Sequence, residues 1–97
     1  MYFRITKVTH AAGKRDELMA ILDTKDDIIN SFEGLKYVKM IAISDTQTVA
    51  ISEYDSEASL QAVEGRFKEV MVDMVPLMSG PPEVMHGGRF WENVLGD

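Results

Sequence analysis

The order in which two hydrophobic periodicities follow each other constrains the fold of this chain more than any other feature. Residues 2–10 alternate with the period of a β-strand. One face holds Phe3, Ile5, Lys7 and Thr9, and the other holds Tyr2, Arg4, Thr6, Val8 and His10. The segments 35–44 and 48–54 are rich in β-branched and aromatic residues, and a short polar break between them predicts an antiparallel hairpin. A Pro- and Gly-containing break opens residues 79–92, which predict a last strand.

Two intervening segments repeat their apolar residues at steps of three and four, which predicts amphipathic helices. The first stripe comprises Leu18, Ile21, Leu22, Ile28, Ile29 and Phe32, and the second comprises Leu60, Val63, Phe67, Val70, Met71 and Met74. Gly34 is expected to end the first helix because glycine tolerates the left-handed backbone found there. Asp55 or Ser56 can cap the second helix, Gly65 is its expected weak point, and Pro76 breaks it.

The resulting order of strand, helix, strand, strand, helix and strand predicts an α+β fold of the ferredoxin-like type, with one domain over residues 1–97. Its four-stranded antiparallel sheet should carry both helices on one face. The strand 35–44 is apolar on both of its faces, so the other face of the sheet should also be covered. A second copy of the chain is the simplest cover, which would make a homodimeric α+β barrel with the last strand in the interface.

Composition narrows the classes of function. The formal net charge of −6 disfavours nucleic acid and anionic membrane as partners. The absence of cysteine excludes thiol nucleophiles and thiolate metal sites and fits a reducing compartment. With two histidines there is no metal motif, and no segment reads as a signal peptide or a membrane span. A cytoplasmic protein is expected.

Four stretches of the sequence are similar to fold-marking stretches of a known family. They are His-Ala-Ala-Gly-Lys at 10–14, Phe-Glu-Gly-Leu at 32–35, Ile-Ser-Glu-Tyr-Asp-Ser-Glu-Ala at 51–58, and Leu-Met-Ser-Gly-Pro-Pro-Glu-Val at 77–84. Together they make the chain resemble the dimeric α+β barrels of the antibiotic-biosynthesis-monooxygenase type. The functions that this resemblance implies are mixed: oxidation of polycyclic aromatic substrates without a cofactor, quinol oxidation and haem degradation.

The resemblance also implies which of these activities to set aside. Members that degrade haem use an asparagine in the first strand and a tryptophan and a histidine on the second helix. The corresponding positions here hold Thr6, Val63 and Met71, so haem handling of that kind is not expected. No flavin, nicotinamide or metal motif is visible either, which fits chemistry without a cofactor.

The candidate catalytic residues are His86 and Arg89. Imidazole can take a phenolic or enolic proton near neutral pH, and a guanidinium can stabilise the resulting anion, a role open to Arg89 or Arg4. Trp91 and Tyr37 are candidate aromatic walls of a substrate pocket. Each has a structural alternative: a surface histidine, an ion pair of Arg89 with a nearby acid, and aromatic side chains in the core or a dimer interface.

Three further residues are candidate pocket residues. Tyr54 can donate a hydrogen bond into a cavity, and Phe67 and Met71 can form an apolar wall, although simple core packing is the commoner role. His10 ends the first strand beside a turn and is expected to be solvated.

Two functions remain open. The first is cofactor-free oxygenation of a small phenol, quinol or polycyclic substrate in a pocket between sheet and helices, and the second is a non-catalytic homodimer that binds a small molecule or has a structural role. Strand parity separates His86 from Arg89 and Trp91 unless a bulge at Gly87 or Gly88 shifts the phase by one residue.

Overall fold

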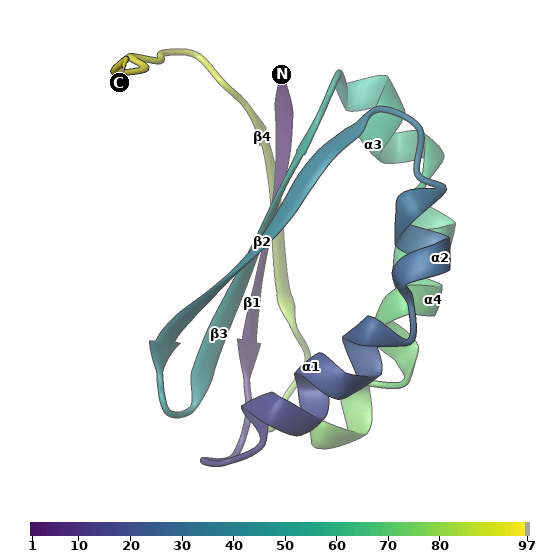
Figure 1. Cartoon of the computed structure of the whole chain (residues 1–97), viewed down its shortest axis with the longest axis vertical. Coiled ribbons are helices and arrows are strands. Elements are labelled where there is room, and N and C mark those ends of the chain that lie inside the picture. The colour runs from purple at the N-terminus through teal and green to yellow at the C-terminus, as the bar shows by residue number, and fades with distance from the viewer. Residues whose placement is uncertain (97) are drawn as a thin grey trace.

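The computed structural model describes residues 1–96 and contains one four-stranded sheet with a layer of helices (Figure 1). In chain order, its elements are β1 (Tyr2–Thr9), α1 (Arg15–Asp23), α2 (Asp26–Asn30), β2 (Leu35–Ser44), β3 (Gln47–Tyr54), α3 (Glu57–Ala62), α4 (Glu64–Val72), a 3₁₀ turn (Val75–Leu77) and β4 (Glu83–Gly88). No helix among these residues is long and apolar enough to cross a membrane.

The strands follow the order β2-β3-β1-β4, and every neighbouring pair is antiparallel. All helices lie on one face of the sheet, and the other face is bare in the single chain (Figure 1). This arrangement confirms the predicted ferredoxin-like α+β fold. Outside strand β1, His10 forms an isolated bridge with Met78 that ties the end of β1 to the segment before β4.

Each predicted helix is divided into two short helices, which the sequence analysis did not anticipate. The first divides at Thr24, whose amide and hydroxyl both donate to the Ile21 carbonyl, at 3.0 and 2.6 Å. The second divides at Val63, whose amide donates to the Leu60 carbonyl at 3.2 Å, two residues before the predicted weak point at Gly65. Bonds that span three residues tighten the last turn of a helix and redirect the chain.

The two predicted apolar stripes form the core with residues of the sheet. Its buried members are Val8, Leu18, Phe32, Tyr54, Leu60, Val63, Val70 and Met74. Ser56 caps α3 by accepting a hydrogen bond from the Ser59 amide at 3.1 Å. Gly34 has a φ of +85°, and a Cβ there would lie 2.6 Å from the Ser59 hydroxyl, so the turn into β2 requires glycine.

The prediction that His10 is solvated is wrong. Its side chain is 1% exposed, and its ring nitrogens lie 2.9 Å from the Thr48 hydroxyl and 3.0 Å from the Ala11 carbonyl. The strand end that appears open in the sequence is covered by the segment after α4, through the bridge to Met78.

The last strand is shorter than predicted. β4 ends at Gly88, and the Arg89 amide makes one more bond to the Met1 carbonyl at 3.1 Å. Because β1 begins at Tyr2, β4 has no further strand residue to pair with. The following segment leaves the sheet (Figure 1) and exposes Phe90 and Trp91.

Candidate functional site

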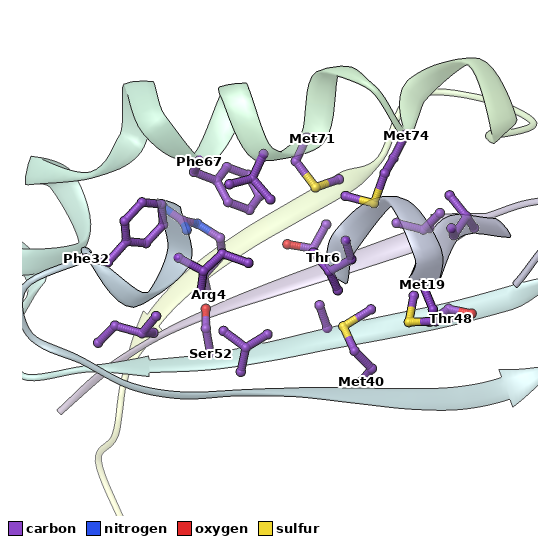
Figure 2. Close-up of a pocket in the computed structure, with 18 of the residues that line it drawn as sticks. Arg4, Thr6, Met19, Phe32, Met40, Thr48, Ser52, Phe67, Met71 and Met74 are labelled. Carbon is purple, nitrogen blue, oxygen red and sulfur yellow. The ribbon is translucent and has the colours of Figure 1, made fainter. Parts of the chain in front are cut away.

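A cavity of about 70 Å³ lies between the sheet and the helices (Figure 2). Most of its lining is apolar, and five of the seven methionines of the chain contribute: Met19, Met40, Met71, Met74 and Met78. Its polar lining residues are Arg4, Thr6, Thr48, Ser52 and Tyr54. The cavity therefore offers an apolar enclosure with a few fixed polar groups, the usual character of a small-molecule site.

The cavity exists because β3 places its small residues toward the helices. Thr48, Ala50 and Ser52 face the cavity, whereas Val49 and Ile51 face the bare side of the sheet. In a two-layer domain the larger apolar residues of a strand normally pack against the helices. This reversed pattern of small and large residues in β3 can be seen in the sequence. It is the signal for the cavity that the sequence analysis missed.

Arg4 is the charged residue of the cavity. Its side chain is 2% exposed, its Nη1 donates to the Tyr54 hydroxyl at 2.7 Å, and its Nη2 is paired with the Glu64 carboxylate. The guanidinium carbon lies 3.8 Å from the centre of the Phe67 ring and 5.3 Å from that of Tyr54. Two aromatic faces and one carboxylate thus hold the guanidinium in a single position.

One nitrogen of the Arg4 guanidinium makes no hydrogen bond. Its Nε is buried and has no hydrogen-bond partner among residues 1–96. An unpaired buried donor costs about 1–3 kcal/mol, so it is uncommon in a folded protein.

His86 lies beside this arrangement but outside the cavity. It pairs with Arg4 across the β1–β4 ladder, and its Nε2 lies 3.6 Å from the same Glu64 oxygen that binds Arg4. Its side chain is 35% exposed and lines a separate groove between α4 and β4. Glu64, which the sequence analysis did not single out, links the buried guanidinium to this imidazole.

The structure brings four of the predicted site residues together around the cavity, namely Arg4, Tyr54, Phe67 and Met71. Tyr37 pairs with Glu53 on the bare side of the sheet, so its ring is not a wall of the cavity. There, burial and the neighbouring Glu53 carboxylate raise the pKa of the Tyr37 hydroxyl.

Arg89 and Trp91 lie away from the cavity. Arg89 pairs with Glu92 at 3.1 Å, as its structural alternative predicted, and Trp91 is 72% exposed. The ladder between β1 and β4 runs in constant register from Lys7 opposite Glu83 to Tyr2 opposite Gly88. Within the paired part of β4 there is accordingly no bulge that would shift His86 onto the face of its predicted partners.

The cavity is small for an aromatic ligand. A cavity of about 150 Å³ admits one benzene ring, and this one is about half as large. Side chains of the wall must therefore move when a ring enters. Methionine is the side chain best suited to such movement, because it is unbranched and polarizable. Among residues 1–96, no group of three or more His, Asp or Glu side chains is placed to hold a metal ion.

Comparison with solved structures places this geometry in a common fold. A monooxygenase from the gene ActVA-Orf6 of Streptomyces coelicolor, in complex with nanaomycin D, matches with a TM-score of 0.82 and 14% identity over 98% of this chain and 92% of that chain. Rv0793 from Mycobacterium tuberculosis matches with a TM-score of 0.77 and 17% identity over 96% and 98% of the two chains.

A third structure, a candidate antibiotic biosynthesis monooxygenase from Chloroflexus aurantiacus J-10-fl, matches with a TM-score of 0.71 and 20% identity over 98% of both chains. At these identities the likeness establishes the fold, in agreement with the resemblance seen in the sequence. No family model and no curated protein matches the chain.

Proposed function

We propose that this protein is a cofactor-independent oxygenase of a small aromatic substrate, a phenol, quinol or hydroxylated polycycle, which it binds in the cavity between sheet and helices. The observation that carries the proposal is Arg4: a buried guanidinium whose Nε is unpaired among residues 1–96, on the wall of a largely apolar cavity. Such a group stabilises an oxyanion strongly because little water competes for it. The fold shared with the Streptomyces coelicolor monooxygenase supports the same reaction class.

In this proposal the substrate supplies the electrons. Loss of a proton gives a phenolate or enolate, whose oxygen accepts a hydrogen bond from the Arg4 Nε. The electron-rich ring then reduces O₂, the two combine as a peroxide, and loss of water leaves a quinone. In this proposal the proton passes to the half-exposed imidazole of His86 by way of the Glu64 carboxylate, which contacts both Arg4 and His86.

Arg4 takes the role of anion stabiliser in preference to Arg89. Arg89 follows β4, is paired with Glu92, and does not line the cavity. His86 keeps the proposed role of proton acceptor because it shares Glu64 with Arg4.

The test is oxygen uptake by the purified protein with anthrone, whose oxidation consumes O₂ and yields anthraquinone and water. Quinone should form in proportion to oxygen consumed, and faster than with heat-denatured protein. Arg4→Met should abolish this excess rate, whereas Arg89→Met should retain it. An excess rate that persists in Arg4→Met, with thermal unfolding unchanged, would contradict the assignment.

The second candidate is a non-catalytic homodimer that binds a small aromatic molecule. It is favoured by the position of His86, whose side chain lies outside the cavity. Saturable binding of anthrone without any excess oxygen uptake would support it, and turnover that depends on Arg4 would exclude it.

Either function is proposed for a homodimer. The bare side of the sheet presents large apolar residues that a single copy leaves partly or fully exposed: Phe3, Ile5, Ile41, Val49, Ile51 and Met85. The segment after β4 adds exposed Phe90, Trp91, Val94 and Leu95. An apolar surface of this kind favours self-association through two-fold packing of the sheets. Sedimentation should give a dimer, and Ile41→Glu should shift it toward monomer.

A further inference from the structure

The cavity is flanked by two surface grooves, one at each edge of the sheet. The groove between α4 and β4 has a volume of about 500 Å³ and shares only Phe67 and Met71 with the cavity lining. The groove between α2 and β2 has a volume of about 370 Å³ and shares six lining residues with the cavity, namely Leu22, Ile29, Phe32, Leu35, Val38 and Met40. The cavity is thus more continuous with the smaller groove.

The two walls also differ in how firmly they are held. On the α4 side the Phe67 ring is stacked 3.8 Å from the Arg4 guanidinium, which Glu64 and Tyr54 hold in turn. On the β2 side, Val38 and Met40 face the helix layer but are 39% and 37% exposed. Because it is partly exposed and unbranched, the Met40 side chain can move without breaking a polar contact.

The register of the sheet leads from this open edge to Arg4. Val38 lies opposite Ser52, and Ser52 lies opposite Arg4, so the three form one row across β2, β3 and β1. The row spans two strand spacings, about 10 Å. Along this row the side chains change from the apolar Val38 at the edge to the hydroxyl of Ser52 and then to the guanidinium of Arg4. The small Ala50 side chain beside the row leaves space between the sheet and the helices.

We propose that the aromatic ligand enters between α2 and β2 with its hydroxyl leading, and lies across β3 so that the hydroxyl reaches Arg4 while the far ring stays at Val38 and Met40. This inference rests on the proposed function, since it concerns the same cavity. Met40 is then the gate of the site, and Ala50 and Val38 limit the size of ligand that fits.

The charges at this entrance suit a neutral ligand. Asp23 and Asp26 line the groove, and its one lysine, Lys36, is paired with Asp55 at 2.9 Å. A negative entrance disfavours a phenolate. The ligand therefore enters protonated and loses its proton inside.

The test replaces exposed residues, each of which lines one of the two grooves and does not line the cavity. Asn30→Trp places a bulky side chain in the α2–β2 groove, and Lys68→Trp is its matched control in the α4–β4 groove. Asp26→Trp is a second variant of the first kind. Stopped-flow fluorescence of 1-naphthol, excited at wavelengths that tryptophan does not absorb, gives the association and dissociation rate constants. Thermal unfolding checks that each variant folds.

Asn30→Trp or Asp26→Trp should slow association and dissociation together by about tenfold and leave the Kd unchanged, because an entrance alters both rates equally. Lys68→Trp should alter neither rate. Slowing by Lys68→Trp, alone or to the same degree, would overturn the entrance, and so would unchanged rates in all variants. If the unsubstituted protein does not bind 1-naphthol, the proposed ligand class is wrong. If it binds 1-naphthol but the variants do not show the expected rates, only the proposed entrance is wrong.

Discussion

Arg4 and His86 occupy directly opposed positions on β1 and β4, yet the Arg4 side chain is 2% exposed and that of His86 is 35% exposed. Both face the helix layer, but a groove lies between α4 and β4 where His86 projects. One carboxylate, that of Glu64, contacts both. The pair therefore links the cavity wall at Arg4 to the separate groove between α4 and β4, and predictions about binding begin with Arg4.

Replacement of Arg4 by lysine should lower the affinity for 1-naphthol by about tenfold or more, which corresponds to about 1.4 kcal/mol. Lysine keeps the charge but lacks the Nε donor and the planar group that stacks on Phe67. Fluorescence titration measures the Kd, and Arg89→Lys is the control because Arg89 does not line the cavity. A loss of affinity in Arg89→Lys but not in Arg4→Lys would show that Arg89, and not Arg4, binds the oxygen of the ligand.

Replacement of Ala50 by leucine should abolish ligand binding without lowering the unfolding temperature. The added carbons occupy the cavity, and their burial, about 0.8 kcal/mol for each CH₂, offsets the packing strain of the larger side chain. Ile51→Leu is the matched control, since that residue lies next in the chain on the opposite face. Calorimetry and titration together check the result, and undiminished binding in Ala50→Leu would place the ligand elsewhere.

Replacement of Thr48 by valine should destabilise the fold by about 1–3 kcal/mol. The Thr48 hydroxyl accepts a hydrogen bond from the Arg15 Nε at 2.9 Å and lies 2.9 Å from the buried His10 ring, so valine leaves both groups without this partner. Urea unfolding measures the loss. Thr9→Val, an exposed change of the same shape, should stay within about 0.5 kcal/mol. Equal effects of the two changes would show that the Thr48 contacts contribute little.

The Tyr37 hydroxyl should ionise at higher pH in the folded protein than in the unfolded chain. Burial is the larger cause of its raised pKa, followed by the Glu53 carboxylate. Folding thus favours the protonated form, so this stabilisation is complete below the unfolded pKa of about 10 and is lost as the pH rises through the folded pKa. Tyrosinate absorbance of the protein minus that of Tyr37→Phe isolates the titration.

Glu53→Gln is the accompanying control for that titration. It should lower the folded pKa of Tyr37 only in part, because the burial remains. A difference curve with its midpoint at or below that of free tyrosine would contradict the prediction.

The fold follows from the sequence because periodicity is a local property, and each predicted strand and helix exists. The breaks at Thr24 and Val63 arise from single hydrogen bonds that span three residues, which periodicity does not report. The end of β4 depends on where β1 begins, and the burial of His10 depends on the bridge to Met78. These are relations between distant parts of the chain.

The candidate site could likewise be predicted only where it depends on local sequence. Strand alternation correctly places Arg4 on the face opposite Phe3 and Ile5. That this face is enclosed at Arg4 and open at His86 depends on how far the helices reach over the sheet. Glu64 was not found because its importance comes from contacts with two strands rather than from its own segment.

The reversed arrangement of β3 has a consequence for how this protein would behave on heating. With threonine, alanine and serine toward the helices, the strand forgoes dispersion contacts that a filled core would supply. A molecule that fills the cavity restores them in the native state alone, so the melting temperature should rise with the logarithm of ligand concentration once the site is saturated. A thermal-shift screen of aromatic compounds would then rank ligands by affinity before any reaction is known.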